Sequence, residues 1–271
     1  MNFSVLLPVY AGDRPDFLRR AYDSVTTEQT LRPDEVVIVR DGPVGEALSA
    51  LLDELGAGEV PTRIVALPVN GGLAAALEVG LAACAHEIVA RMDADDISLP
   101  GRFAAQVPLV AGGLDIVGSA IQEFAEESEP GLVRCPPVGA EEIRRRARFV
   151  SPFNHPTVVY RKSAVRDAGG YQDLPLMEDY WLFARMLAAG AGAANIPEPL
   201  VLYRIGAGAY ARRGGRGILR SELVFQRKML SIGFLSWPQF LRNCAVRGVY
   251  RLVPEGIRKV GYRAFIRKGW K

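Results

Sequence analysis

Acidic residues in three short motifs have the types and the spacing that chemistry requires. The first motif is Asp93-Ala94-Asp95, which follows Arg91 and Met92. Two carboxylates one residue apart in a turn can share Mg²⁺ or Mn²⁺, and the cation then stabilises a departing diphosphate. An acidic turn that caps the next helix is the alternative. Because the acids directly follow an apolar strand, at the edge where α/β folds place ligands, we favour a functional site.

The other two motifs are ambiguous when each is taken alone. Asp41 lies before Gly42 at the end of a second apolar run. It can accept a hydrogen bond from a nucleobase or a ribose, or it can form a turn or a helix cap, and the two interpretations are equally good. Glu178 and Asp179 begin a helix, where acids complement the helix dipole. One of them can instead take a proton from an acceptor hydroxyl.

Apolar, β-rich runs alternate along the chain with helical patterns, and these elements must position the acidic residues. Strands are predicted at residues 3–9, 35–39, 63–67, 87–92, 115–120, 152–160 and 199–203. Helices are predicted at residues 15–26, 73–83, 162–168, 178–189 and 218–232, with others after residues 100 and 237. This alternation implies parallel βαβ units, whose ligands gather at the carboxyl ends of the strands. Residues 122–138, with several acids and prolines, are expected to form an exposed connection.

Length and composition fit one globular α/β domain with a modest appendage. The chain has 271 residues, of which 49% are hydrophobic and 23% charged. The net charge is +3, but the positive charge is concentrated after Arg204, where Glu222 and Glu255 are the only acids. The rest of the chain is therefore acidic, which weighs against a nucleic-acid-binding protein that uses the basic tail.

Three widely spaced cysteines without CxxC spacing weigh against a disulfide framework and a zinc site. They fit the reducing cytoplasm. The sequence shows neither a signal-peptide pattern nor an apolar run of about 20 residues, so we expect a protein that does not span a membrane.

Taken together and in this order, the motifs resemble the family-two glycosyltransferases over residues 1–205. The motifs that carry the resemblance are Ser4-Val5-Leu6-Leu7-Pro8-Val9-Tyr10, Asp41, Asn70-Gly71-Gly72-Leu73 with Gly80, Asp93-Ala94-Asp95-Asp96, and Glu178-Asp179-Tyr180-Trp181-Leu182. The resemblance implies a GT-A fold, which is a Rossmann-like αβα sandwich, and an inverting transfer of a sugar from a nucleotide-sugar donor. Residues 206–271 would then form a basic loop and an amphipathic helical C-terminal extension.

The resemblance also implies roles for individual residues. Asp93 and Asp95 would hold Mn²⁺ or Mg²⁺, Asp41 would read the donor base, and Asp179 would be the general base, with Glu178 as the second candidate. The residues expected around the donor are Pro8, Tyr10, Asp41, Asn70, Gly71, Arg91, Asp93, Ala94, Asp95, Arg212 and Arg213. The residues expected at the acceptor are His155, Tyr180 and Trp181, although a structural role for His155 is the simpler one.

Within that family the chain looks most like transferases of bacterial exopolysaccharide, O-antigen and cell-wall glycan assembly. Phe153-Asn154-His155-Pro156-Thr157 is one such feature. No Gln-x-x-Arg-Trp motif follows the helix that begins at Glu178, so the transfer is expected to be non-processive. The resemblance implies a UDP- or dTDP-sugar donor and a polyprenyl-linked or glycan acceptor.

The tail at residues 250–270 mixes aromatic and aliphatic residues with Arg and Lys. Such helices can lie in an anionic membrane interface or pack on the catalytic domain, and an acceptor on a lipid carrier favours the first. We therefore expect a cytoplasmic protein that lies peripherally on the inner face of the cell membrane.

A sugar-phosphate nucleotidyltransferase is the rival enzyme class. It would need a Gly-rich loop with Lys or Arg directly after the first strand. Ala11-Gly12-Asp13-Arg14 matches that pattern poorly.

Overall fold

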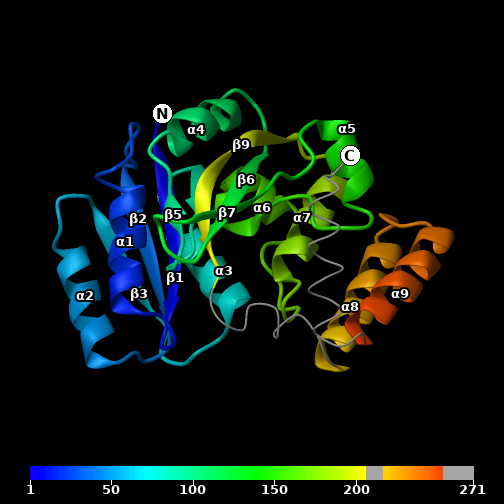
Figure 1. Cartoon of the computed structure of the whole chain (residues 1–271), viewed down its shortest axis with the longest axis horizontal. Helices are drawn as coiled ribbons and strands as arrows, with labels where there is room; N and C mark the ends of the chain where they lie inside the picture. Colours follow the sequence, from blue (N-terminus) through cyan, green and yellow to red (C-terminus); the bar gives the residue numbers. More distant parts are fainter. Residues whose placement is uncertain (206–215, 253–271) are drawn as a thin grey trace.

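A mixed sheet of nine strands forms the centre of the computed structural model, which describes residues 1–205 and 216–252 (Figure 1). The strands are β1 (Phe3–Tyr10), β2 (Glu35–Asp41), β3 (Thr62–Ala66), β4 (Ile88–Arg91), β5 (Ile97–Ser98), β6 (Ile116–Phe124), β7 (Pro130–Arg134), β8 (Val159–Arg161) and β9 (Ala193–Arg204). Their order is β3-β2-β1-β4-β8-β6-β9-β5, with β7 paired to β6. The predicted parallel arrangement is confirmed for β1 to β4, whereas β8 pairs antiparallel with both β4 and β6.

Helices cover both faces of this sheet. They are α1 (Pro15–Val25), α2 (Glu46–Gly56), α3 (Leu73–Ala83), α4 (Arg102–Ala111), α5 (Ala140–Arg146), α6 (Lys162–Asp167), α7 (Glu178–Ala188), α8 (Arg216–Ser231) and α9 (Trp237–Leu252). Successive residues of a strand point to opposite faces, so Val5 and Leu7 pack with α1, α2 and α4, while Leu6 packs with α3, α6 and α7. The result is the expected αβα sandwich.

Helix α3 lies unusually close to the sheet at Gly80. A Cβ atom at this position would clash with Leu6 and would lie 2.6 Å from Cγ2 of Val39. Only glycine therefore allows α3 to approach β1 and β2 this closely, and the approach fixes where the N-terminus of α3 meets the sheet edge.

The second half of the chain departs from several predictions. The segment 122–138, expected to be an exposed connection, instead continues β6 to Phe124 and returns as β7. The strand predicted at 152–160 is mostly a turn with a 3₁₀ helix at His155–Thr157, and β8 begins only at Val159. Proline lacks the N–H that a strand donates, and Pro152 and Pro156 fall in this segment. Helices α2 and α5 were not predicted.

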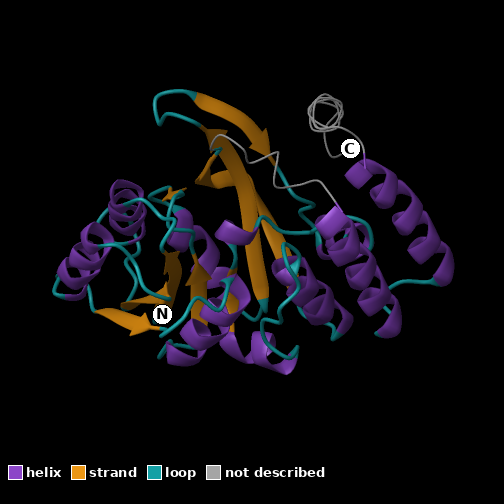
Figure 2. Cartoon of the chain, turned by 90° about the horizontal axis from the view of Figure 1, so that it is seen from below, coloured by secondary structure: helices purple, strands orange, loops and turns teal. Residues whose placement is uncertain are grey.

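Helices α8 and α9 form a pair at one end of the molecule (Figures 1 and 2). Phe225 of α8 packs on Tyr180 of α7, with 4.4 Å between the ring centroids. Among the described helices, none combines the length and the apolar character that crossing a bilayer requires. The division into residues 1–205 and 206–271 stays a prediction.

Candidate functional site

The carboxyl ends of β1, β2 and β4 meet at one edge of the sheet. The parallel register sets Tyr10 beside Asp41, and Asp93 follows β4 after one further residue. A pocket of about 550 Å³ opens at this edge. Its lining residues are Pro8, Val9, Tyr10, Asp13, Phe17, Asp41, Asn70, Gly72, Leu73, Ala76, Asp93, Ala94, Asp95, Tyr203 and Arg204. Most of the residues predicted around the donor are therefore brought together.

At one end of the pocket, Asp41 stabilises the turn at Gly71 and Gly72. Its side chain is nearly buried, and its two carboxylate oxygens accept the backbone N–H groups of Gly71 at 2.7 Å and Gly72 at 3.0 Å. The Asn70 amide donates to the Asp41 carbonyl oxygen at 3.2 Å. Gly42 has a φ of 83°, and a Cβ there would lie 2.7 Å from the Asn70 nitrogen. Asp41 thus fixes the turn that begins α3, and its contact with a nucleobase stays a prediction.

Three carboxylates gather at the other end of the pocket. Oxygens of Asp93, Asp95 and Asp96 lie within 4.8 Å of one another. Asp96 is 1% exposed, and its Oδ1 accepts the backbone N–H of Arg204 at 2.8 Å. Its Oδ2 has no hydrogen-bond partner among the described residues. Burial, and then the charges of Asp93 and Asp95, raise the pKa of Asp96 well above its usual value.

This donor set fits a hard divalent cation, which prefers carboxylate oxygens and would relieve the repulsion within the cluster. The sequence predicted Asp93 and Asp95 as ligands and did not assign Asp96.

Arg91 is buried next to the carboxylate cluster and does not line the pocket. Its side chain is 1% exposed and forms an ion pair with Asp93. Nε and Nη1 of Arg91 have no hydrogen-bond partner within the described part of the chain. A role of Arg91 toward the donor would therefore act through Asp93.

Glu178 and Asp179 begin α7 directly after a strained turn. Leu176 has a φ of 63°, in the left-handed region that disfavours side chains such as leucine. Burial, and then the charge of Asp179, raise the pKa of Glu178 from its usual 4.5 to about 7. Burial also raises the pKa of Asp179, whose Oδ1 accepts the Tyr180 N–H at 2.7 Å. The Arg91 charge opposes both shifts, so this guanidinium lies within electrostatic reach of Asp93 and of the α7 carboxylates.

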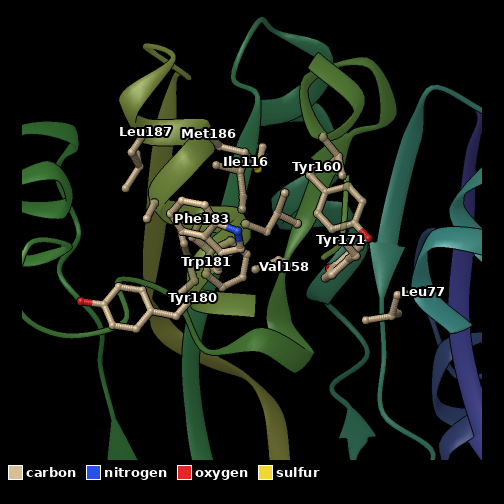
Figure 3. Close-up of a cluster of buried hydrophobic side chains, with 14 of the residues drawn as sticks. Leu77, Ile116, Val158, Tyr160, Tyr171, Tyr180, Trp181, Phe183, Met186 and Leu187 are labelled. Atoms are coloured by element: carbon tan, nitrogen blue, oxygen red, sulfur yellow. Dashed lines mark hydrogen bonds between the residues drawn. The ribbon is translucent and has the colours of Figure 1, made fainter. Parts of the chain in front are cut away.

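The three residues predicted at the acceptor, His155, Tyr180 and Trp181, are buried and do not line the pocket. Figure 3 shows Tyr180 and Trp181. Burial, and then the Arg91 charge, lower the pKa of His155 well below its usual value, so the ring is neutral. Its Nε2 lies 3.0 Å from the Tyr171 hydroxyl. Figure 3 shows Tyr180 directed away from the aromatic cluster, and its hydroxyl donates to a backbone carbonyl at 2.8 Å. Trp181 is 4% exposed. Acceptor contact by these residues stays a prediction.

Arg204 lines the pocket, and its place in a Tyr-Arg pair before a Gly/Arg-rich segment fits phosphate contact and a solvated basic linker equally well. Its guanidinium lies over the rings of Phe17, 3.8 Å from the centroid, and Phe124, at 4.4 Å. Its Nε donates to the Asp95 carbonyl oxygen at 2.8 Å. Arg212 and Arg213 of the Gly/Arg-rich segment, predicted at the donor, lie outside the described residues.

Asp13 is another pocket residue that was not predicted from the sequence. Burial raises the pKa of its carboxyl to about 6, with smaller contributions from the charges of Asp95 and Asp93, although its Oδ2 accepts the Tyr10 N–H at 2.8 Å. Asp13 therefore adds a further acid to a pocket that is already acidic.

Known proteins share both the sequence and the fold of this chain. The family model described as Glycosyl transferase family 2 matches residues 4–169. The amylovoran biosynthesis glycosyltransferase AmsE of Erwinia amylovora is 38% identical over 96% of this chain and 97% of its own length. The UDP-Gal:alpha-D-GlcNAc-diphosphoundecaprenol beta-1,3-galactosyltransferase of Escherichia coli is 34% identical over 98% of this chain and 97% of its own length.

A solved structure supports the fold. The mannosyltransferase PcManGT from Pyrobaculum calidifontis, in complex with GDP-Man and Mn²⁺, superposes with a TM-score of 0.64 at 16% identity. The match covers 90% of this chain and 68% of that one. The fold is therefore GT-A-like, as the motifs implied. The match of the family model to more than half of the chain, and relatives alike over nearly its whole length, show that this protein is a glycosyltransferase that belongs to glycosyl transferase family 2.

Proposed function

We propose that this enzyme transfers a sugar, with inversion at the anomeric carbon, from a nucleoside diphosphate sugar to a hydroxyl of a polyprenyl-linked glycan acceptor in the synthesis of a bacterial cell-surface polysaccharide. The observation that carries the proposal is the pocket of about 550 Å³, which joins the Asp41 turn to the Asp93-Asp95-Asp96 cluster. A pocket of this size accommodates a nucleotide sugar. The names of the Escherichia coli and Erwinia amylovora relatives support the donor, the lipid-linked acceptor and the pathway.

The donor would lie along the pocket with its base toward Asp41 and its diphosphate toward Asp93 and Asp95. Bound Mn²⁺ or Mg²⁺, held by Asp93 and Asp95 with Asp96 beside them, would neutralise charge on the leaving diphosphate. Arg204 stands at the same end and presents a guanidinium fixed between two aromatic rings. Such a planar, preorganised donor group suits phosphate oxygens. By its resemblance to the family, the donor would be a UDP- or dTDP-sugar.

Asp179 is our candidate for the general base, and Glu178 is the alternative. The acceptor oxygen attacks the anomeric carbon from the face opposite the diphosphate, and its proton passes to the carboxylate. The bond from the anomeric carbon to the diphosphate oxygen breaks, and the nucleoside diphosphate leaves with the electron pair. Burial supports this role, because a carboxylate with a raised pKa is a stronger base than an exposed one.

The experiment is acceptor-dependent release of the nucleoside diphosphate, measured for wild type, Asp179→Asn, Glu178→Gln and a control, Asp173→Asn. Asp173 is exposed in the same segment, so its variant should retain wild-type turnover. We expect Asp179→Asn to lose turnover by at least about a thousandfold while it still binds the donor. Full turnover by Asp179→Asn would reject this base, and release of pyrophosphate instead would indicate a nucleotidyltransferase.

The remaining predictions concern where the enzyme works. We propose that residues 1–205 form the catalytic domain and that residues 206–271 form a basic helical extension. We further propose that the enzyme lies at the cytoplasmic face of the membrane, where a polyprenyl diphosphate would present its glycan. The predicted membrane-binding residues of the far tail, beyond residue 252, lie outside the described residues.

A further inference from the structure

Helix α9 exposes apolar side chains on one face. Trp237 is 66% exposed and Leu241, one helical turn later, is 61% exposed. Ala245, a further turn along the same face, is also exposed, and Ile232 in the turn before α9 is 40% exposed. Single exposed apolar residues are ordinary, but a Trp and a Leu on one helical face mark a contact surface. We call Trp237, Leu241 and Ala245 the α9 apolar face.

The helices that carry this face expose cations and no carboxylate. From Arg216 to Leu252 the only acid is Glu222. It is 0% exposed and forms an ion pair with Arg247, at 2.6 Å between Nε and Oε1. Arg220, Arg227 and Arg242 are exposed. The described part of α8 and α9 therefore presents a cationic surface.

The α9 apolar face is fixed rigidly to the catalytic domain. The Asn243 amide, fully buried, donates to the Arg148 carbonyl oxygen at 2.8 Å and to Oε1 of Gln226 at 2.9 Å. Through Phe225, α8 packs on Tyr180. Tyr180 follows Asp179 directly on α7, so these contacts connect the α9 apolar face to the helix that carries the candidate base (Figure 1).

We infer that the α9 apolar face, with the cations of α8 and α9, lies in the interface of an anionic lipid bilayer and holds the enzyme over its lipid-linked acceptor. This inference deepens the proposed function and depends on it for the acceptor. Trp is enriched at the headgroup level, and cations near it gain from an anionic surface. A stable protein partner usually buries about 800 Å² on each side. A Trp and a Leu with nearby cations are few for such an interface, but they suffice for reversible membrane binding.

The first arm of the test is co-sedimentation of the full chain with vesicles of phosphatidylcholine alone or with about one-third phosphatidylglycerol. We expect binding to the anionic vesicles that weakens as salt rises. The variant Trp237→Ser/Leu241→Ser should reduce partitioning roughly tenfold. The control Val69→Ser/Leu109→Ser removes apolar residues that are also exposed, 68% and 41%, and lie outside α8 and α9, and should leave partitioning unchanged.

The second arm locates the contact directly. The chain has three tryptophans, and Trp181 is 4% exposed. In a Trp270→Phe variant, quenching by brominated lipid therefore reports on Trp237. We expect quenching with anionic vesicles.

Equal binding by the double variant and wild type, or no quenching of Trp237, would overturn the inference and assign any membrane contact to another part of the chain. A change of oligomeric state in Trp237→Ser/Leu241→Ser, without a change in vesicle binding, would indicate a protein interface instead. Calorimetric binding of UDP and of dTDP, each with Mn²⁺, is measured on the same samples. If either nucleotide binds and vesicles do not, the membrane inference fails alone. If neither nucleotide binds, the proposed function fails.

Discussion

Replacing Arg91 by Met removes the cation buried beneath the carboxylate cluster. Arg91 pairs with Asp93, and oxygens of Asp93, Asp95 and Asp96 lie within 4.8 Å of one another. Arg102 is a second buried guanidinium nearby. It donates to the Arg91 carbonyl oxygen at 2.6 Å and to Oε1 of Gln106, so we do not expect it to replace Arg91 as the partner of Asp93. In the absence of metal, the Arg91→Met variant would therefore keep the carboxylates of Asp93, Asp95 and Asp96 close together without the positive charge of Arg91.

The size of the effect follows from burial. Removal of one partner of a buried ion pair costs about 3–5 kcal/mol. Because the Asp93 side chain is 29% exposed, water can solvate its charge when Arg91 is absent, and the cost is smaller than for a fully buried pair. We expect a decrease of about 2–3 kcal/mol in the free energy of unfolding. For a chain of this length that corresponds to a decrease of about 5–10 °C in Tm.

Thermal unfolding with EDTA and with Mn²⁺ measures this effect. Because Arg91 and a bound cation compete for the charge of Asp93, Mn²⁺ should raise the Tm of Arg91→Met more than that of wild type. Arg166→Met is the control, since Arg166 is 75% exposed and its ion pair among the described residues is with its neighbour Asp167. This variant should change stability by less than about 0.5 kcal/mol. A loss below about 1 kcal/mol in Arg91→Met, or an equal Mn²⁺ effect on both proteins, would refute the reasoning.

Three further predictions concern the candidate base Glu178, the core at Gly80 and the pocket residue Arg204. Burial and the Asp179 charge raise the pKa of Glu178 from 4.5 to about 7, so the folded state binds this proton more tightly than the unfolded state. Unfolding free energy should therefore fall as pH rises from about 4.5 to about 7, and a Glu178→Gln variant should show a shallower fall in denaturant titrations. Gly80→Ala places a Cβ against Leu6 and should lower the free energy of unfolding by about 1–3 kcal/mol; an unchanged denaturation midpoint would contradict the close approach of α3. Arg204→Leu should weaken UDP binding about tenfold in calorimetry while circular dichroism stays unchanged, and wild-type affinity would remove Arg204 from the donor site.

The first hundred residues could be predicted because their signals are local. The strands β1, β2 and β4 end in, or directly before, polar residues. In a parallel sheet those ends meet at one edge, so Tyr10, Asp41, Asp93 and Asp95 came together as expected.

The second half of the chain depends on long-range pairing. Strand β9 lies beside β6 with a shifted register, and its residues Pro197 and Pro199 obscure the strand pattern in the sequence. Contacts between residues far apart in the sequence also explain why parts of the site were not predicted. Asp96 is buried against the N–H of Arg204, 108 residues later. No local pattern reveals such a contact, nor the burial of Arg91.

The central claim is that the pocket binds a nucleotide through its carboxylate cluster, and calorimetric titration of UDP, dTDP, GDP and CDP tests it most directly. Each nucleotide is titrated with and without Mn²⁺ into wild type, Asp93→Ala and the control Asp173→Asn. We predict that UDP or dTDP binds to wild type and to the control only with Mn²⁺, and that Asp93→Ala loses this binding. Failure of every nucleotide to bind the folded wild-type protein, or equal binding by Asp93→Ala, would contradict the account.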